Sequence, residues 1–95
     1  MVFMAILRRR TEVFAAAEFA EHQDAEADRV RRLYADGIVR SVWSRGDVPG
    51  AFMLLEASDV AAAERALASL PFVSRNMADA QIVELRPYRG FLPAD

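Results

Sequence analysis

The chain of 95 residues contains no cysteine and no lysine. The lack of cysteine excludes disulfides, thiolate nucleophiles and thiolate metal ligands. The lack of lysine excludes Schiff-base catalysis on a side-chain amine, and all 12 basic residues are arginine. The chain has one histidine, no calcium-loop spacing and no glycine-rich phosphate loop. We therefore expect no metal and no cofactor.

Long apolar runs and an excess of basic charge are also missing. No stretch approaches the roughly 20 apolar residues that span a bilayer, and the apolar residues 2–7 are too few for a secretory signal. A formal net charge of -2 does not suit binding to a phosphate backbone. We expect a cytoplasmic protein with no membrane and no nucleic-acid partner, folded as a single domain over residues 1–95.

The pattern of apolar residues predicts six main elements. Residues 2–7 are uniformly apolar, which indicates a central strand. Residues 11–36 lack glycine and proline and predict a long helix that ends at Gly37, although residues 11–17 are alternatively an approach loop. Two strands at 38–45 and 51–56, a helix at 60–70 and a last strand at 81–86 follow, with residues 72–78 irregular.

This order of elements is typical of the α+β class with a ferredoxin-like βαββαβ fold. It predicts a four-stranded antiparallel sheet with two helices on one face. The predicted third strand carries Phe52 and Leu54 on one face and Met53 and Leu55 on the other. Because exposed apolar patches of this size are rare, we expect the uncovered face to pair in a homodimer, a dimeric α/β barrel, or in a higher homo-oligomer.

The most informative position on the long helix is Glu26. It lies seven residues from both Phe19 and Leu33, so it shares their inward stripe and faces the sheet. A buried carboxylate needs a partner or a water-filled cleft, and Arg40 on the adjacent strand is a candidate partner. His22 and Gln23 precede Glu26 by four and three residues. The sequence therefore groups a carboxylate, an amide and an imidazole on one side of the helix.

Two interpretations of this group remain open. A carboxylate in an apolar cleft has its pKa raised toward the range of a general base, which would suit proton transfer. Alternatively, Glu26 lies at the helix flank and pairs with Arg29 or an arginine from a neighbouring strand, and His22 is a solvated surface residue. Trp43, with Phe52 nearby, either lines a pocket for an aromatic compound or belongs to the core or a dimer interface.

Several short motifs resemble the muconolactone isomerase family. They are residues 32–43 (RLYADGIVRSVW), the apolar strand after the predicted hairpin, and Leu70-Pro71-Phe72. In that family a helix ending at glycine leads into a strand that carries arginine and tryptophan, and a leucine-proline pair follows the second helix. The likeness covers about residues 19–72. The closing residues 85–88 (LRPY) are more weakly similar to YciI-like proteins, which share the same fold.

This resemblance implies a cofactor-independent isomerase that moves a proton on a small cyclic or aromatic-derived carbonyl compound. Glu26 aligns with a glutamate on the long helix of that family, so the resemblance implies Glu26 as the base. From its place four residues earlier on the helix, we expect His22 to act as a proton shuttle at the mouth of the site. Arg40 and Trp43 match the family pattern, so the resemblance implies that Arg40 holds a carboxylate or oxyanion and that Trp43 forms a wall of the site. Ser41 and Phe52 are further substrate-binding candidates because of their places on the predicted strands.

Ser41 and Ser44 depart from the family, which has histidine and arginine at these two places. These departures favour an alternative function, a non-catalytic barrel that binds a small ligand or acts as an accessory subunit. A third possibility is a cofactor-free monooxygenase of the same fold. In each case the expected partner is a small molecule.

Overall fold

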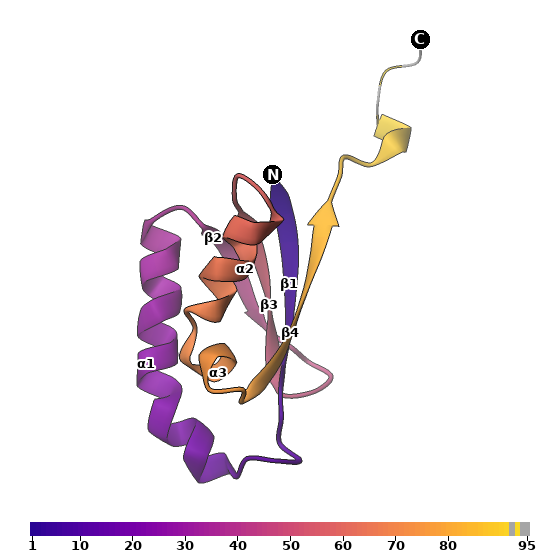
Figure 1. Ribbon diagram of the computed structural model, residues 1–95. Coiled ribbons are helices and arrows are strands. Elements are labelled where there is room, and N and C mark those ends of the chain that lie inside the picture. Colours follow the sequence, from indigo (N-terminus) through magenta and orange to yellow (C-terminus); the bar gives the residue numbers. More distant parts are fainter. Residues whose placement is uncertain (92, 94–95) are drawn as a thin grey trace.

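The fold is one antiparallel sheet covered on one side by helices. The computed structural model describes residues 1–91 and 93. The four strands lie in the order β2-β3-β1-β4, and every neighbouring pair is antiparallel. Figure 1 shows α1, α2 and α3 on the same side of this sheet. The elements, in chain order, are β1 (Val2–Arg9), α1 (Ala16–Ala35), β2 (Val39–Ser44), β3 (Gly50–Glu56), α2 (Val60–Ala68), α3 (Pro71–Ser74), β4 (Ala78–Leu85) and the 3-10 turn η1 (Arg89–Phe91).

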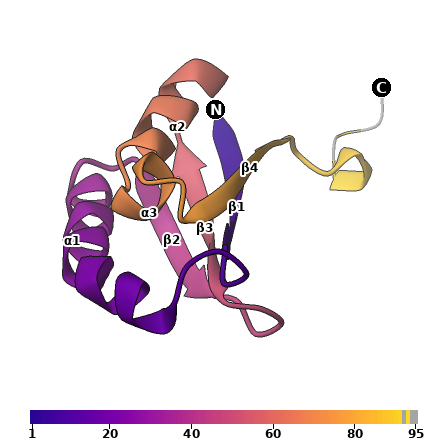
Figure 2. The ribbon, with the colours of Figure 1, turned by 60° about the horizontal axis from the view of Figure 1, so that its bottom comes forward.

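This arrangement confirms the predicted α+β, ferredoxin-like fold. The second view shows the same two layers, with the segment after β4 leading away from the helices (Figure 2). The sheet therefore has one face that the helices cover, which we call the helix face. The other face is left uncovered by the helices, and we call it the open face.

The long helix is shorter at its start than the composition alone suggested. Glu18 accepts a hydrogen bond from the backbone N–H of Ala15 at 2.6 Å, so α1 begins only after Ala15 and residues 11–15 form an approach loop. The predicted end is confirmed, because Gly37 adopts a φ of 80° and lets Ile38 donate back to the carbonyl of Leu33 at 2.9 Å.

The side chains of β2 do not alternate regularly between the two faces of the sheet. A register shift between Val39 and Ser41 breaks the simple alternation, because a bulge places one extra residue opposite β3. Val39 therefore pairs with Leu55, while Ser41 pairs with Leu54. As a result Val39, Val42 and Ser44 belong to the helix face, and Ser41 and Trp43 belong to the open face.

Two further boundaries differ from the sequence prediction. β1 continues to Arg9, and β4 starts at Ala78, because Arg9 pairs with Ala78 and Arg8 with Asp79. The stretch expected to be irregular contains the short helix α3, which begins at Pro71. Proline suits the first turn of a helix, where no internal partner for its missing N–H is needed.

The core lies between the helices and the helix face. Phe3, Leu33, Leu55 and Leu70 are each at most 1% exposed. The open face has no such cover. Its apolar side chains, placed there by strand register, are Val2, Met4, Ile6, Trp43, Phe52, Leu54, Val83 and Leu85.

Replacing Leu55 tests this description of the core. Leu55 is 0% exposed, so Leu55→Ala leaves a cavity and should lower the free energy of unfolding by about 2 to 5 kcal/mol. The control Val13→Ala alters a side chain that is 55% exposed and should change it by less than about 0.5 kcal/mol. Urea denaturation measures both, and equal effects would contradict the assigned core.

Candidate functional site

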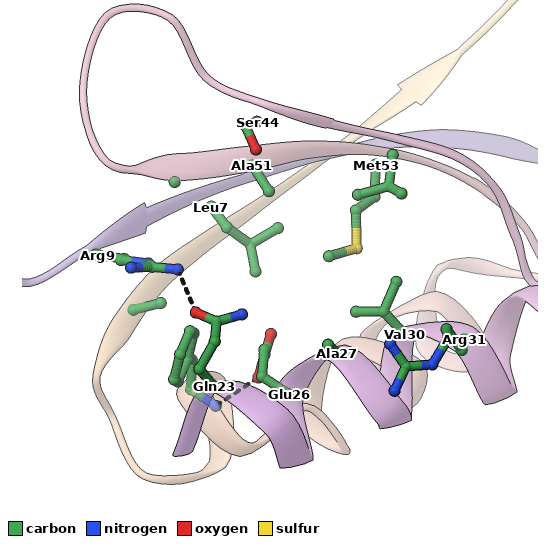
Figure 3. Close-up of a pocket in the computed structure, with 14 residues that line it drawn as sticks. Leu7, Arg9, Gln23, Glu26, Ala27, Val30, Arg31, Ser44, Ala51 and Met53 are labelled. Atoms are coloured by element: carbon green, nitrogen blue, oxygen red, sulfur yellow. Dashed lines mark hydrogen bonds between the residues drawn. The ribbon is translucent and has the colours of Figure 1, made fainter. Parts of the chain in front are cut away.

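A cavity of about 290 Å³ opens between α1 and the helix face of the sheet. Its apolar wall is formed by Leu7 of β1, Ala27 and Val30 of α1, and Met53 of β3. Its polar groups are Arg9, Gln23, Glu26, Arg31 and Ser44. Figure 3 shows Gln23 and Glu26 rising from α1 toward the strands that carry Leu7 and Ser44. A mostly apolar hollow with a few converging polar groups is typical of a small-molecule site.

Glu26 is the buried charged residue of the described chain and is 6% exposed. Its Oε1 accepts a hydrogen bond of 2.9 Å from the backbone N–H of Phe72, in the first turn of α3. Among residues 1–91 and 93, no partner is found for Oε2, and no fully buried side-chain oxygen or nitrogen there lacks a partner. Oε2 is therefore accessible to solvent. Because Glu26 lines the cavity, this oxygen faces the cavity.

The surroundings of Glu26 shift its ionisation. Burial raises the pKa of its carboxyl group, because the charged form loses solvation. The hydrogen bond from Phe72 and the positive charge of Arg9 oppose this effect but do not cancel it. The pKa of Glu26 is therefore shifted upward, in the direction that favours a general base.

Arg9 forms part of the cavity wall and is held from two sides. Its Nη2 donates to Oε1 of Gln23 at 2.8 Å, drawn as a dashed line in Figure 3. The guanidinium carbon lies 5.4 Å from the ring centroid of Phe19 and 5.1 Å from that of Phe72. These contacts fix the planar group by cation–π attraction.

A second hollow shares Arg9 and Gln23 with this cavity. Its volume is about 690 Å³, and its lining includes Phe14, Phe19 and Asp24. Arg9 and Gln23 line both spaces. These two side chains thus belong to the walls of both spaces, which we call the inner cavity, lined by Glu26, and the outer hollow.

The structure brings together only part of the predicted site. Glu26 faces the sheet, as predicted, and Gln23 joins it in the cavity. His22 is half-buried on α1 and is not among the residues that line either space. Its role as a shuttle at the mouth stays a prediction. The four substrate-binding candidates do not meet Glu26, because the open face carries Arg40, Ser41, Trp43 and Phe52.

The expected partners of Glu26 are corrected as well. Arg40 lies beside Glu56, to which its Nη1 donates at 3.1 Å, because the bulge in β2 turns it away from the helices. Arg29 instead donates from Nε to Ser69 Oγ at 2.9 Å. Glu26 is thus held by a backbone N–H and not by an arginine side chain.

Sequence reasoning missed three polar residues of the cavity, Arg9, Arg31 and Ser44. A signal for Arg9 existed, since it continues the alternation of Phe3, Ala5 and Leu7 on the helix face of β1. Ser44 was noted in the sequence only as a departure from the family pattern, and its pairing with Ala51 places it on the helix face. Nothing in the local pattern distinguished Arg31 from the solvated arginines of α1.

Within residues 1–91 and 93, no group of three or more histidine, aspartate or glutamate side chains is placed to hold a metal ion. None of the helices found there is both long and apolar enough to cross a membrane.

The raised pKa of Glu26 makes stability depend on pH. The folded protein holds this proton more tightly than the unfolded chain, so the stabilising contribution is full below the ordinary value of 4.5 and is lost as pH rises through the folded-state pKa. Glu26→Gln keeps an oxygen acceptor for the Phe72 N–H without a charge. We expect its free energy of unfolding, relative to the unmodified protein, to increase from about pH 4 to about pH 8. Urea denaturation across this range measures the difference, and a constant difference would contradict the raised pKa.

Comparison with known proteins relates the chain to two solved structures. No protein-family model matches the sequence, and no curated protein sequence is similar to it. Muconolactone isomerase superposes with a TM-score of 0.78 at 18% identity, covering 100% of this chain and 98% of that one.

The 5-chloro-2-hydroxyhydroquinone dehydrochlorinase of Burkholderia phenoliruptrix, solved in complex with 2,5-dihydroxybenzoquinone, gives a TM-score of 0.76 at 13% identity. That match covers 95% of this chain and 98% of the dehydrochlorinase. At these identities the likeness shows the fold alone. The chain has the muconolactone isomerase-like fold that its sequence motifs suggested.

Proposed function

We propose that this protein is a cofactor-independent enzyme that moves a proton on a small cyclic or aromatic-derived carbonyl compound, with Glu26 as the base. One observation carries the proposal. Glu26 is 6% exposed, with Oε1 fixed by the Phe72 N–H and Oε2 directed to the cavity. A carboxylate held in this way is oriented for transfer at one atom.

The chemistry at this oxygen is a simple exchange of one proton. Oε2 takes a proton from a carbon next to the substrate carbonyl, so the C–H bond breaks, an O–H bond forms on Glu26, and the electron pair moves onto the carbonyl oxygen. When a C=C double bond adjoins the deprotonated carbon, the resulting dienolate carries charge on a second carbon, and the neutral acid returns the proton there, so that the double bond shifts. The raised pKa of Glu26 suits both steps, because the group must gain and lose the proton near neutral pH.

The rest of the cavity supports this reaction. The apolar side chains of Leu7, Val30 and Met53 exclude water from much of the space, which strengthens the electrostatic interactions inside it. Positive charge at Arg9 and Arg31 favours the enolate oxygen. A volume of about 290 Å³ is at the lower end for small-molecule sites and therefore suits a compound with one ring.

The two structural neighbours support the substrate class by analogy. One is named as an isomerase of a lactone, and the other as a dehydrochlorinase of a hydroxyhydroquinone solved with a dihydroxybenzoquinone. Both names describe small oxygenated rings. The specific substrate of this chain is not carried over from either protein.

Hydrogen–deuterium exchange tests the base directly. In D₂O, the unmodified protein should exchange the protons next to the carbonyl of small lactones, cyclic enones and hydroquinone-derived ketones faster than buffer does. Glu26→Gln should reduce this rate by about 100-fold to 10,000-fold, or to the buffer rate, because the amide cannot accept the proton. Proton NMR follows the loss of the signal over time.

Glu21→Gln is the matched control, because Glu21 lies on the same helix with an exposed side chain and should leave the rate unchanged. Full exchange activity in Glu26→Gln would contradict the proposal. Binding without exchange for every compound would support the second candidate function, a non-catalytic ligand-binding protein. That candidate is favoured by Ser44, which lines the cavity where the resemblance implies an arginine.

The open face supports an assembly as a homodimer. Trp43 is 51% exposed there, and Val2, Val83 and Leu85 are between 37% and 39% exposed. Its rims carry the ion pairs Arg40–Glu56 and Arg8–Asp79, while its centre is apolar. A second copy would offer the same apolar centre, as a symmetric interface requires.

Introducing charge at the centre of this face tests the dimer. Leu54→Glu should convert the dimer to a monomer, because the interface would bury an unpaired carboxylate. Val13→Glu adds the same charge at an exposed site away from the sheet and should leave the mass unchanged. Sedimentation velocity measures both variants, and a monomeric unmodified protein would refute the assembly.

A further inference from the structure

The arginines of this chain differ in whether they have a carboxylate partner. Ion pairs with aspartate or glutamate are formed by Arg8, Arg10, Arg32, Arg40, Arg45 and Arg86. Arg29 donates to a serine hydroxyl. Of the arginines without an ion pair among residues 1–91 and 93, only Arg9 and Arg31 line the Glu26 cavity.

Arg9 is fixed in place although it has no carboxylate partner in the described chain. Its guanidinium lies against the rings of Phe19 and Phe72, and Gln23 accepts a hydrogen bond from its Nη2. The backbone of Arg9 is also held, since its N–H donates to the carbonyl of Pro49 at 2.9 Å. The side chain has therefore already lost much of the freedom that ligand binding would otherwise cost.

The guanidinium retains unused donors. It carries five N–H groups, and the described side chains and carbonyls accept only one of them, the bond to Gln23. The amide of Gln23 is neutral, and Arg9 forms no ion pair among residues 1–91 and 93. A rigid, partly buried guanidinium with free donors at a cavity wall binds a carboxylate through two parallel hydrogen bonds.

We propose that Arg9 binds the anionic group of the substrate, so that the inner cavity takes a small ring compound that carries a carboxylate. What Glu26 does to the bound compound rests on the proposed function, but the binding itself does not. Arg9 and Glu26 line the same cavity, so an anion on Arg9 holds the ring beside Oε2. The cavity carries two arginines and one glutamate, which leaves a net positive charge when Glu26 is ionised.

Arg31 is the competing anchor, and its setting is less suitable. It is exposed on α1, five residues after Glu26, and lies on the far side of Glu26 from Arg9 in Figure 3. No aromatic ring and no hydrogen-bond acceptor fixes it within the described residues. Binding an anion there would cost the ordering of a long side chain, whereas Arg9 is already ordered.

Calorimetry with matched probes tests the anchor. The probes are benzoate and muconolactone, each compared with its neutral methyl ester. The unmodified protein should bind at least one of the two acids about tenfold more tightly than its ester, because a hydrogen-bonded charge pair contributes this much. Arg9→Met should lose this preference while the affinity for the ester stays the same. Arg9→Lys should retain only part of it, because an ammonium group lacks the planar fork.

Four control variants separate the anchor from its surroundings. Arg31→Met and Gln23→Ala should keep the preference for the acid, the latter because it removes the bridge but not the guanidinium. Ala27→Phe fills the inner cavity and should abolish binding, whereas Ala20→Phe lies in the outer hollow and should not. If Arg9→Met fails to fold, as judged by thermal melting, Arg9→Lys decides the question.

The inference is overturned if neither acid binds, if each acid and its ester bind equally, or if Arg31→Met alone removes the preference. Its failure is distinct from failure of the proposed function. Glu26→Gln should still bind the acid in preference to the ester, since the base plays no part in the ion pair. A protein that shows this preference without any deuterium exchange would retain Arg9 as an anion anchor and lose Glu26 as a catalytic base.

Discussion

The hydrogen bond from the Phe72 N–H to Glu26 is the interaction on which the site depends. A carboxylate that is 6% exposed is costly to bury, and without a donor it would be excluded from the interior. The donor comes from α3, whose first turn offers a backbone N–H with no partner inside the helix. One bond thus connects α1 to α3 and leaves the second carboxylate oxygen for the cavity. The same contact makes Glu26 both a structural residue and the strongest candidate for chemistry.

The two faces of the sheet differ in the side chains that they carry. The helix face contributes polar side chains to the cavity, namely Arg9 at the end of β1 and Ser44 at the end of β2. The open face is apolar and is suited to a second copy of the chain. Trp43 and Phe52, which resembled pocket residues in the sequence, lie on this open face. Residues that are close in the sequence of β2 therefore lie on opposite faces of the sheet because a strand alternates its sides.

Much of the fold was predictable, and the exceptions have physical causes. Uniform apolar runs, the glycine that ends α1 and the turn before β3 are local signals, and they indicated the order of the elements. The inward position of Glu26 followed from helical spacing alone. The bulge at Arg40 was not predictable, because the extra residue is set by pairing with β3 and not by the sequence of β2. The partner of Glu26 was also not predictable. It is a backbone N–H 46 residues away in the chain, and no side-chain type in the sequence marks such a donor.

The pKa of Glu26, measured directly, tests the central claim most closely. Titration of the side-chain carboxyl carbon of Glu26 by carbon-13 NMR, assigned through Glu26→Gln, reports this group alone. We predict a midpoint above the ordinary value of 4.5, because the buried carboxylate loses more solvation than Phe72 and Arg9 restore. A midpoint at or below 4.5 would contradict this claim. Glu26 would then be a well-compensated structural carboxylate, and the cavity beside it would be a binding site without a base.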